Sequence, residues 1–204
     1  MGLDLEPMGR AVAGQEAEWE RLMEILYKGG DAPPDHAARL LGVSVPPYAD
    51  ISAPRVGFDA AADAWMIARA RRAGETKPDA EIIAATKGYY VVELLLGKSD
   101  GVPAYSNSGL YDVGATSFRG EFLKDCTAFL DTSTITLAWR NFTRPSEAVA
   151  YGQRLIAALN RPVGPLSGGA AGGLSVQEQR QVIDIAERWY VFWGRRGNPI
   201  WANF

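Results

Sequence analysis

The chain has 204 residues, of which 47% are hydrophobic and 22% are charged, and this balance is typical of one soluble globular domain. The formal net charge is −3 and the isoelectric point is about 5.3, which disfavours nucleic acid as a partner because non-specific nucleic-acid binding draws on clustered Lys and Arg. The single cysteine excludes an intrachain disulfide, and the most apolar stretch, YYVVELLL, is too short to span a bilayer. We therefore expect a soluble cytoplasmic protein without a membrane partner.

Helical periodicity dominates the first part of the chain. Apolar residues recur at helical spacing over residues 15–28, and two glycines then end the pattern. A shorter helix is predicted over residues 31–42, where Asp31 can cap it. Three prolines make residues 43–58 typical of irregular chain, and a further helix is predicted from Asp59, its cap, to about Arg72.

The middle of the chain predicts two more helices. Residues 76–96 have apolar positions all round the helical wheel, which indicates a buried helix, and residues 97–103 are typical of a turn. Another helix is expected over residues 117–130. The stretch 132–142 is rich in Thr, Ile and Trp, but a lone strand would have no partner, so we favour helix or irregular chain there.

The last part of the chain predicts a helix over residues 146–160, a linker of small residues over 162–174, and a helix from Ser175 to about Trp193. Ser175 and Glu178 have the spacing of a capping box. The polar tail that follows contains one large apolar anchor, Trp201.

These patterns together predict a mostly α-helical protein, a single globular domain of about six helices with long irregular loops and little or no sheet. We expect a helical core over residues 1–161 and a linker over 162–174. A C-terminal amphipathic helix and tail over 175–204 would dock on the core or on a second subunit, which makes a homodimer conceivable.

Most catalytic signatures are missing from the sequence. With one histidine, His36, and one cysteine, a zinc site built on Cys and His and a Ser-His-Asp or Cys-His triad are excluded. No phosphate-binding or dinucleotide-binding glycine motif is present. We therefore expect neither a metal nor a cofactor, no catalytic residue is assigned, and we interpret His36 as a surface or capping residue.

Arg119 and Glu93 are polar residues at positions predicted to be buried. Arg119 falls inside the apolar arc of the predicted helix 117–130, and Glu93 interrupts the most apolar part of the predicted helix 76–96. A buried carboxylate needs a cationic or donor partner, so we expect Arg119 to pair with Glu93, with Asp112 as the other candidate acid. Such a pair could fix the packing of two helices, or it could line a pocket.

The loop between these helices is the best candidate site. Its donors, acceptors and glycines, followed by the amide groups at the predicted helix start, suit a carboxylate or a phosphate, although turns need the same residue types. The candidate ligand-binding residues are Arg119, Glu93, Tyr105, Ser106, Asn107, Tyr111, Asp112, Thr116 and Ser117.

Three functions compete at this point. The favoured one is a binding or regulatory module that recognises a protein partner or a small anionic ligand through residues 105–119. The alternative is a small-molecule enzyme of the hydrolase or transferase type that uses carboxylate, tyrosine and arginine chemistry in the same pocket. The third, nucleic-acid binding, would need the Arg clusters at 69–72 and 194–196 to form one basic face.

Overall fold

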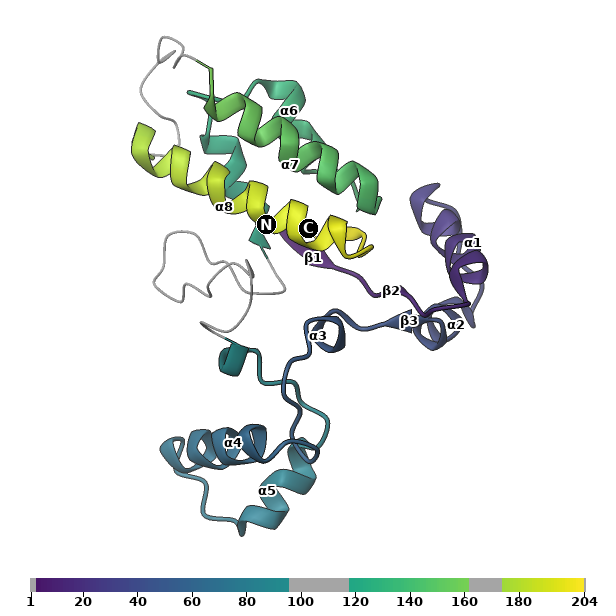
Figure 1. Cartoon of the computed structure of the whole chain (residues 1–204), viewed down its shortest axis with the longest axis vertical. Coiled ribbons are helices and arrows are strands. Elements are labelled where there is room, and N and C mark those ends of the chain that lie inside the picture. The colour runs from purple at the N-terminus through teal and green to yellow at the C-terminus, as the bar shows by residue number, and fades with distance from the viewer. Residues whose placement is uncertain (1–2, 96–117, 162–173, 204) are drawn as a thin grey trace. The chain divides into compact units, whose positions relative to one another are not determined.

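The computed structural model describes residues 3–95, 118–161 and 174–203, and these residues are mostly helical (Figure 1). Contacts divide the chain into two compact units, which comprise residues 1–47 with 101–204 and residues 48–100. The predicted helical class is confirmed. The expectation of little or no sheet is wrong, because four strands of the first unit form an antiparallel sheet.

The described elements of the first unit are helices with short strands interspersed among them. Their bounds are β1 Asp4–Pro7, β2 Arg10–Ala11, α1 Glu16–Tyr27, α2 His36–Gly42, β3 Ser44–Val45, β4 Phe118–Arg119, the 3-10 helix η2 Gly120–Asp125, α6 Thr132–Leu137, β5 Phe142–Thr143, α7 Pro145–Leu159, α8 Val176–Arg195 and β6 Ile200–Asn203.

The sheet is formed by pairing the two ends of the chain, in the strand order β4-β1-β6-β5. In β6, Ile200 and Ala202 are buried and Trp201 between them is 38% exposed, as the two-residue period of a strand requires. The predicted anchoring role of Trp201 is therefore wrong. The tail instead ends in a strand, because β6 pairs with β1 on one side and with β5 on the other.

Helix α8 confirms the predicted capping box. The Ser175 hydroxyl accepts a hydrogen bond from the Glu178 N–H, and the Glu178 carboxylate accepts one from the Ser175 N–H. Its buried face packs against α7 of the same chain (Figure 1). Of the predicted linker over 162–174, only Leu174 lies among the described residues, so the predicted domain division stays a prediction.

Two predicted helices are not formed as expected. Residues 118–119 are strand β4, and Gly120 then begins a 3-10 helix with its N–H donated to the Leu3 carbonyl. A β-carbon on Gly120 would lie 2.7 Å from the Leu5 Cδ1 atom, so the chain touches β1 too closely for another residue type. Pairing with distant residues has therefore overridden the local helical pattern over 117–130.

The second unit consists of α4 Ala60–Arg72, α5 Asp79–Thr86 and the 3-10 helix η1 Val92–Leu95, preceded by α3 Pro47–Asp50, which begins at the boundary. The predicted helix 76–96 ends ten residues early, because Gly88 has a φ of +93° and the chain turns back there. Hydrogen bonds from Val56 to Tyr89 and from Val91 to Pro54 then hold the returning segment. Helix α5 is largely exposed rather than buried.

The remaining predictions fare unevenly. Helices over 15–28, 59–72 and 146–160 are confirmed, and the helix expected over 31–42 begins only at residue 36. Over 132–142, the favoured helix is present as α6. The strand that was disfavoured there also exists, because β5 finds its partner in β6. Among the described helices, none combines the length and the apolar character needed to cross a membrane.

Gly152 of α7 sets how closely α7 and α8 approach. A β-carbon there would lie 2.5 Å from the Val191 Cγ2 atom and 3.1 Å from the Glu187 carbonyl oxygen of α8. We expect Gly152→Ala to lower the free energy of unfolding by about 1–3 kcal/mol, although alanine is the better helix former. Urea denaturation followed by circular dichroism measures this change.

Gly42→Ala is the matched control, because a β-carbon at Gly42 meets no atom within 4 Å. It should leave the stability unchanged or raise it by up to about 1 kcal/mol. Adding Val191→Ala to Gly152→Ala should recover part of the loss. Equal stability of the two glycine variants would contradict close packing at Gly152.

Candidate functional site

The loop favoured from the sequence lies outside the described residues, which leaves the roles of Tyr105, Ser106, Asn107, Tyr111, Asp112, Thr116 and Ser117 as predictions. Glu93 belongs to η1 of the second unit, and its side chain is also outside the described set, so its pairing with Arg119 stays a prediction.

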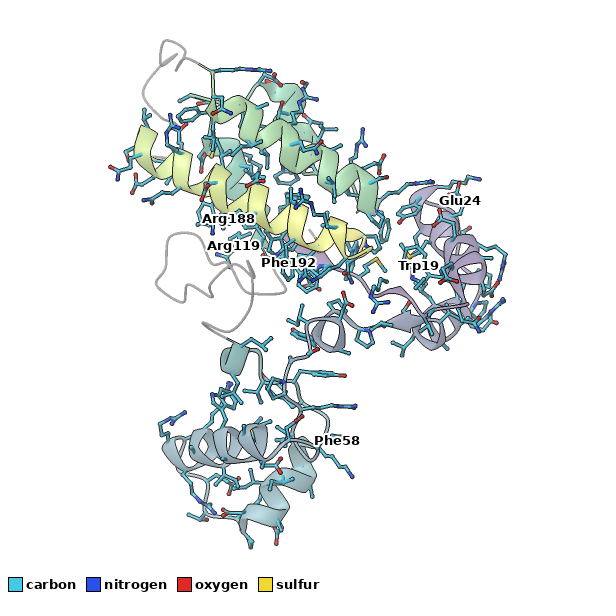
Figure 2. The ribbon with its side chains drawn as sticks, in the orientation of Figure 1. Trp19, Glu24, Phe58, Arg119, Arg188 and Phe192 are labelled. Atoms are coloured by element: carbon cyan, nitrogen blue, oxygen red, sulfur yellow. The ribbon has the colours of Figure 1, made fainter. Side chains whose placement is uncertain are left out.

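The expected position of Arg119 on the buried face of a helix is wrong. It lies in β4 (Figure 2), where Phe118 is fully buried, and successive side chains of a strand point to opposite faces. The Arg119 side chain is 39% exposed, and its Nε atom lies 3.8 Å from a carboxylate oxygen of Asp4 and 3.8 Å from one of Glu121. The structure thus brings Arg119 to two acids that the sequence did not single out.

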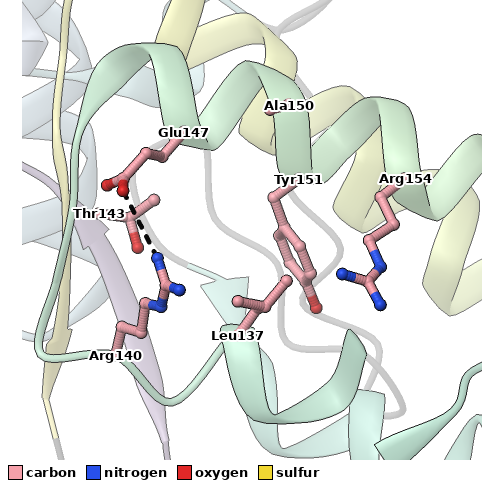
Figure 3. Close-up of a pocket in the computed structure, with 7 residues that line it drawn as sticks. All are labelled: Leu137, Arg140, Thr143, Glu147, Ala150, Tyr151 and Arg154. Atoms are coloured by element: carbon pink, nitrogen blue, oxygen red, sulfur yellow. Dashed lines mark hydrogen bonds and ion pairs between the residues drawn. The ribbon is translucent and has the colours of Figure 1, made fainter. Parts of the chain in front are cut away.

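A cavity of about 260 Å³ lies instead between α6, β5 and α7 (Figure 3). It is lined by Leu137, Arg140, Thr143, Glu147, Ala150, Tyr151 and Arg154. Glu147, Tyr151 and Arg154 share one face of α7 because residues three and four apart are neighbours on a helix. Glu147 also fixes the start of α7, since its Oε2 atom accepts a hydrogen bond of 2.9 Å from the Arg144 N–H.

Tyr151 forms the buried wall of this cavity. It is 5% exposed, and its ring packs edge-on against Tyr190 with 4.7 Å between the ring centroids. Burial raises the pKa of the Tyr151 phenol above its ordinary value, so the hydroxyl keeps its proton and remains a donor. Among the described residues, this hydroxyl has no hydrogen-bond partner.

Two guanidinium groups line the cavity on either side of Tyr151 (Figure 3). The Arg154 Nη2 atom donates a hydrogen bond of 2.6 Å to the Ser133 hydroxyl and lies near the Asp131 carboxylate, at 3.6 Å. The Arg140 Nη1 atom lies 3.5 Å from the Glu147 Oε1 atom. Each guanidinium has five N–H donors, so these contacts leave both with donor capacity toward the cavity.

A second cavity, of about 570 Å³, adjoins the first and shares Arg140 and Glu147 with it. It lies beside the last turn of α1, where the Tyr27 hydroxyl is another buried donor without a partner in the described chain. Arg144 stacks over the Tyr27 ring at 4.5 Å and donates a hydrogen bond of 2.5 Å to Glu24. We call the two cavities together the tyrosine–arginine site.

The tyrosine–arginine site has an unequal charge lining. Its cationic lining residues are Lys28, Arg140, Arg144 and Arg154, and its one described carboxylate is Glu147. The acids that pair with the cations from outside the lining include Glu24 and Asp131, which hold the guanidinium groups in place. The lining is therefore rich in donors and poor in acceptors, a composition that suits an anion.

Sequence reasoning missed Arg140, Tyr151 and Arg154. One signal was present, because Tyr151 lies four residues before Leu155 on the apolar face of a predicted helix, and a buried hydroxyl needs a partner. No local pattern could place Arg140 beside it, since that contact depends on how the chain turns between α6 and α7.

In the described residues, no group of three or more His, Cys, Asp or Glu side chains could hold a metal ion. His36 is the first residue of α2 and is 3% exposed, which corrects the expectation of a surface residue.

The comparisons give no family or relative from which a role could be transferred. No protein-family model, curated protein or solved structure matches the chain. The functional argument therefore rests on the chemistry of the site alone.

The Asp131 carboxylate caps α6 and pairs with Arg154, so the pKa of this carboxyl is sensitive to both interactions. Hydrogen bonds from the Ser133 hydroxyl and from the Thr134 N–H and side chain lower the pKa of the Asp131 carboxyl from 3.8 to about 2. Because the folded pKa is lowered, the stabilisation is complete above about pH 4 and is lost as the pH falls through 2. We expect Ser133→Ala to raise this pKa toward 3.8, measured by NMR titration of the carboxyl carbon.

Ser146→Ala, at an exposed position of α7, is the control and should leave the Asp131 titration unchanged. A wild-type midpoint near 3.8, or equal midpoints in Ser133→Ala and wild type, would contradict this account of the cap.

Cys126 is buried as a free thiol, and burial, aided by the charge of Asp125, raises its pKa to about 12. We expect iodoacetamide at pH 8 to alkylate the folded protein more than about 100-fold more slowly than the urea-unfolded chain, because the thiolate is the reactive form. Mass spectrometry at timed intervals measures both rates. Comparable rates would show that the thiol is accessible in the folded state.

Proposed function

We propose that this protein is a binding module that recognises a small anionic ligand in the tyrosine–arginine site. The observation that carries the proposal is the lining of four cationic side chains against one carboxylate, next to two buried tyrosine hydroxyls without described partners. A carboxylate or phosphate in the cavity would accept hydrogen bonds from the guanidinium groups of Arg140 and Arg154.

The size of the cavities supports a small ligand. The cavities of about 260 and 570 Å³ lie just below and well within the range of about 300–1,000 Å³ that is usual for small-molecule sites, and they suit a short carboxylate or a phosphate ester. We propose binding rather than catalysis, because the described lining offers one carboxylate and Glu147 is already engaged in capping α7. The enzyme alternative, and recognition through residues 105–119, remain predictions.

A cytoplasmic location, a protein partner and a homodimer formed through the C-terminal helix also remain proposals. The apolar face of α8 is buried against its own chain, so a dimer of that kind would have to exchange the whole helix between two copies.

The test is calorimetric titration at low salt with inorganic phosphate, pyrophosphate and citrate as probes. We expect at least one of them to bind, and Arg140→Ala and Arg154→Ala to weaken that binding about 10- to 100-fold, since each removes a hydrogen bond to a charged group. Tyr151→Phe keeps the packing on Tyr190 and should leave the affinity nearly unchanged, because the hydroxyl that it removes has almost no accessible surface.

Arg188→Ala is the matched control. Arg188 is 51% exposed and pairs with Asp184 on the surface of α8, outside both cavities, much as Arg154 pairs with Asp131 (Figure 2). It should leave the affinity unchanged. The proposal is wrong when none of the three anions binds, or when Arg154→Ala and Arg188→Ala bind the anion equally well.

A further inference from the structure

Glu147 is the described carboxylate that the two cavities of the tyrosine–arginine site share. It lines both of them, as Arg140 does, whereas Arg154 lines only the smaller cavity and Arg144 only the larger one. Glu147 also lies between these two arginines along α7, whose Cα atoms are about 15 Å apart at the rise of an α-helix. The site therefore has cations on both sides of one acid.

The charged side chains of this arrangement are accessible to a ligand. Those of Arg140, Arg144, Glu147 and Arg154 are between 41% and 52% exposed. Figure 3 shows that Glu147 and Arg154 extend from α7 on either side of Tyr151. A ligand can thus reach the acid and the cations directly, whereas the Tyr151 hydroxyl between them is buried.

The Glu147 carboxylate keeps part of its capacity to accept hydrogen bonds. Its Oε2 atom accepts one of 2.9 Å from the Arg144 N–H, and its Oε1 atom lies 3.5 Å from the Arg140 Nη1 atom. A carboxylate has about four lone-pair sites, so further donors can be accommodated. It repels an anionic group and accepts a hydrogen bond from a hydroxyl. The middle of the site therefore favours hydroxyl groups, and its two ends favour anionic groups.

Each end of the site offers two cations. The larger cavity has Lys28 and Arg144, and the smaller one has Arg154 together with the shared Arg140. A phosphate ester carries a charge of about −1.5 to −2 at pH 7 and three acceptor oxygens, so it can use two cations at once. A carboxylate carries a single charge and uses such a pair less fully.

We propose that the tyrosine–arginine site binds a sugar or polyol that carries a phosphate at each end. One phosphate lies between Arg140 and Arg154, the other lies between Lys28 and Arg144, and hydroxyl groups of the carbon chain donate hydrogen bonds to Glu147. This inference rests on the anion binding proposed above and specifies the class of anion.

Calorimetric titration at low salt compares two bisphosphates that differ only in their hydroxyl groups. D-Mannitol 1,6-bisphosphate carries hydroxyl groups along its chain, and hexane-1,6-diol bisphosphate carries none. We expect the mannitol compound to bind about 10-fold more tightly, which is the worth of a hydrogen bond to a charged group. It should also bind at least about 10-fold more tightly than inorganic phosphate, because its second phosphate is held close to the other pair of cations.

Glu147→Gln should reduce the preference for the mannitol compound to less than about 3-fold, because a neutral acceptor forms the weaker hydrogen bond. Glu178→Gln is the matched control. Glu178 is likewise the capping-box glutamate at the third position of its helix, but it lies outside both cavities, so the preference should persist.

The two ends of the site are tested separately. Arg144→Ala and Arg154→Ala should each reduce the advantage of mannitol 1,6-bisphosphate over inorganic phosphate, since either change weakens one phosphate position. Arg188→Ala, outside both cavities, should preserve that advantage.

Three results would overturn this inference: equal affinity of the wild type for the two bisphosphates, the same preference in Glu147→Gln as in Glu178→Gln, or an undiminished bisphosphate advantage in both Arg144→Ala and Arg154→Ala. Binding of inorganic phosphate without a preference for the mannitol compound would refute only this choice of ligand. Absence of binding by every anion would refute the proposed function and this inference with it.

Discussion

Burial of the aromatic face of α8 is the interaction on which the first unit depends. Trp189, Tyr190 and Trp193 are at most 1% exposed, and each buries a large apolar surface. Trp189 contacts the ring of Phe118, which ties α8 to strand β4, and Tyr190 contacts Tyr151 of α7. The same helix therefore holds the sheet on one side and the buried wall of the tyrosine–arginine site on the other, so the position of the Tyr151 hydroxyl follows from core packing.

Helices were predictable from the sequence where the signal is local, and strands were not. The capping box of α8 and the periodicity of α1, α4 and α7 lie within a few consecutive residues. Strand β1 is four residues long and pairs with β6 at the other end of the chain, so neither segment carries its partner in its own pattern. The candidate site shares this limit, since Arg140 meets the end of α1, which is far away in the sequence, only in the folded chain.

A buried polar atom without a partner does not by itself mark a site. The indole nitrogens of Trp189 and Trp193 also have no partner in the described chain, yet neither residue lines one of the two cavities. There the cost of an unmet donor is offset by the large apolar surface that each ring buries. Tyr151 borders a cavity, but its hydroxyl is as inaccessible as the two indole nitrogens, so the structure offers an anion the four cationic side chains of the lining and not this unmet donor.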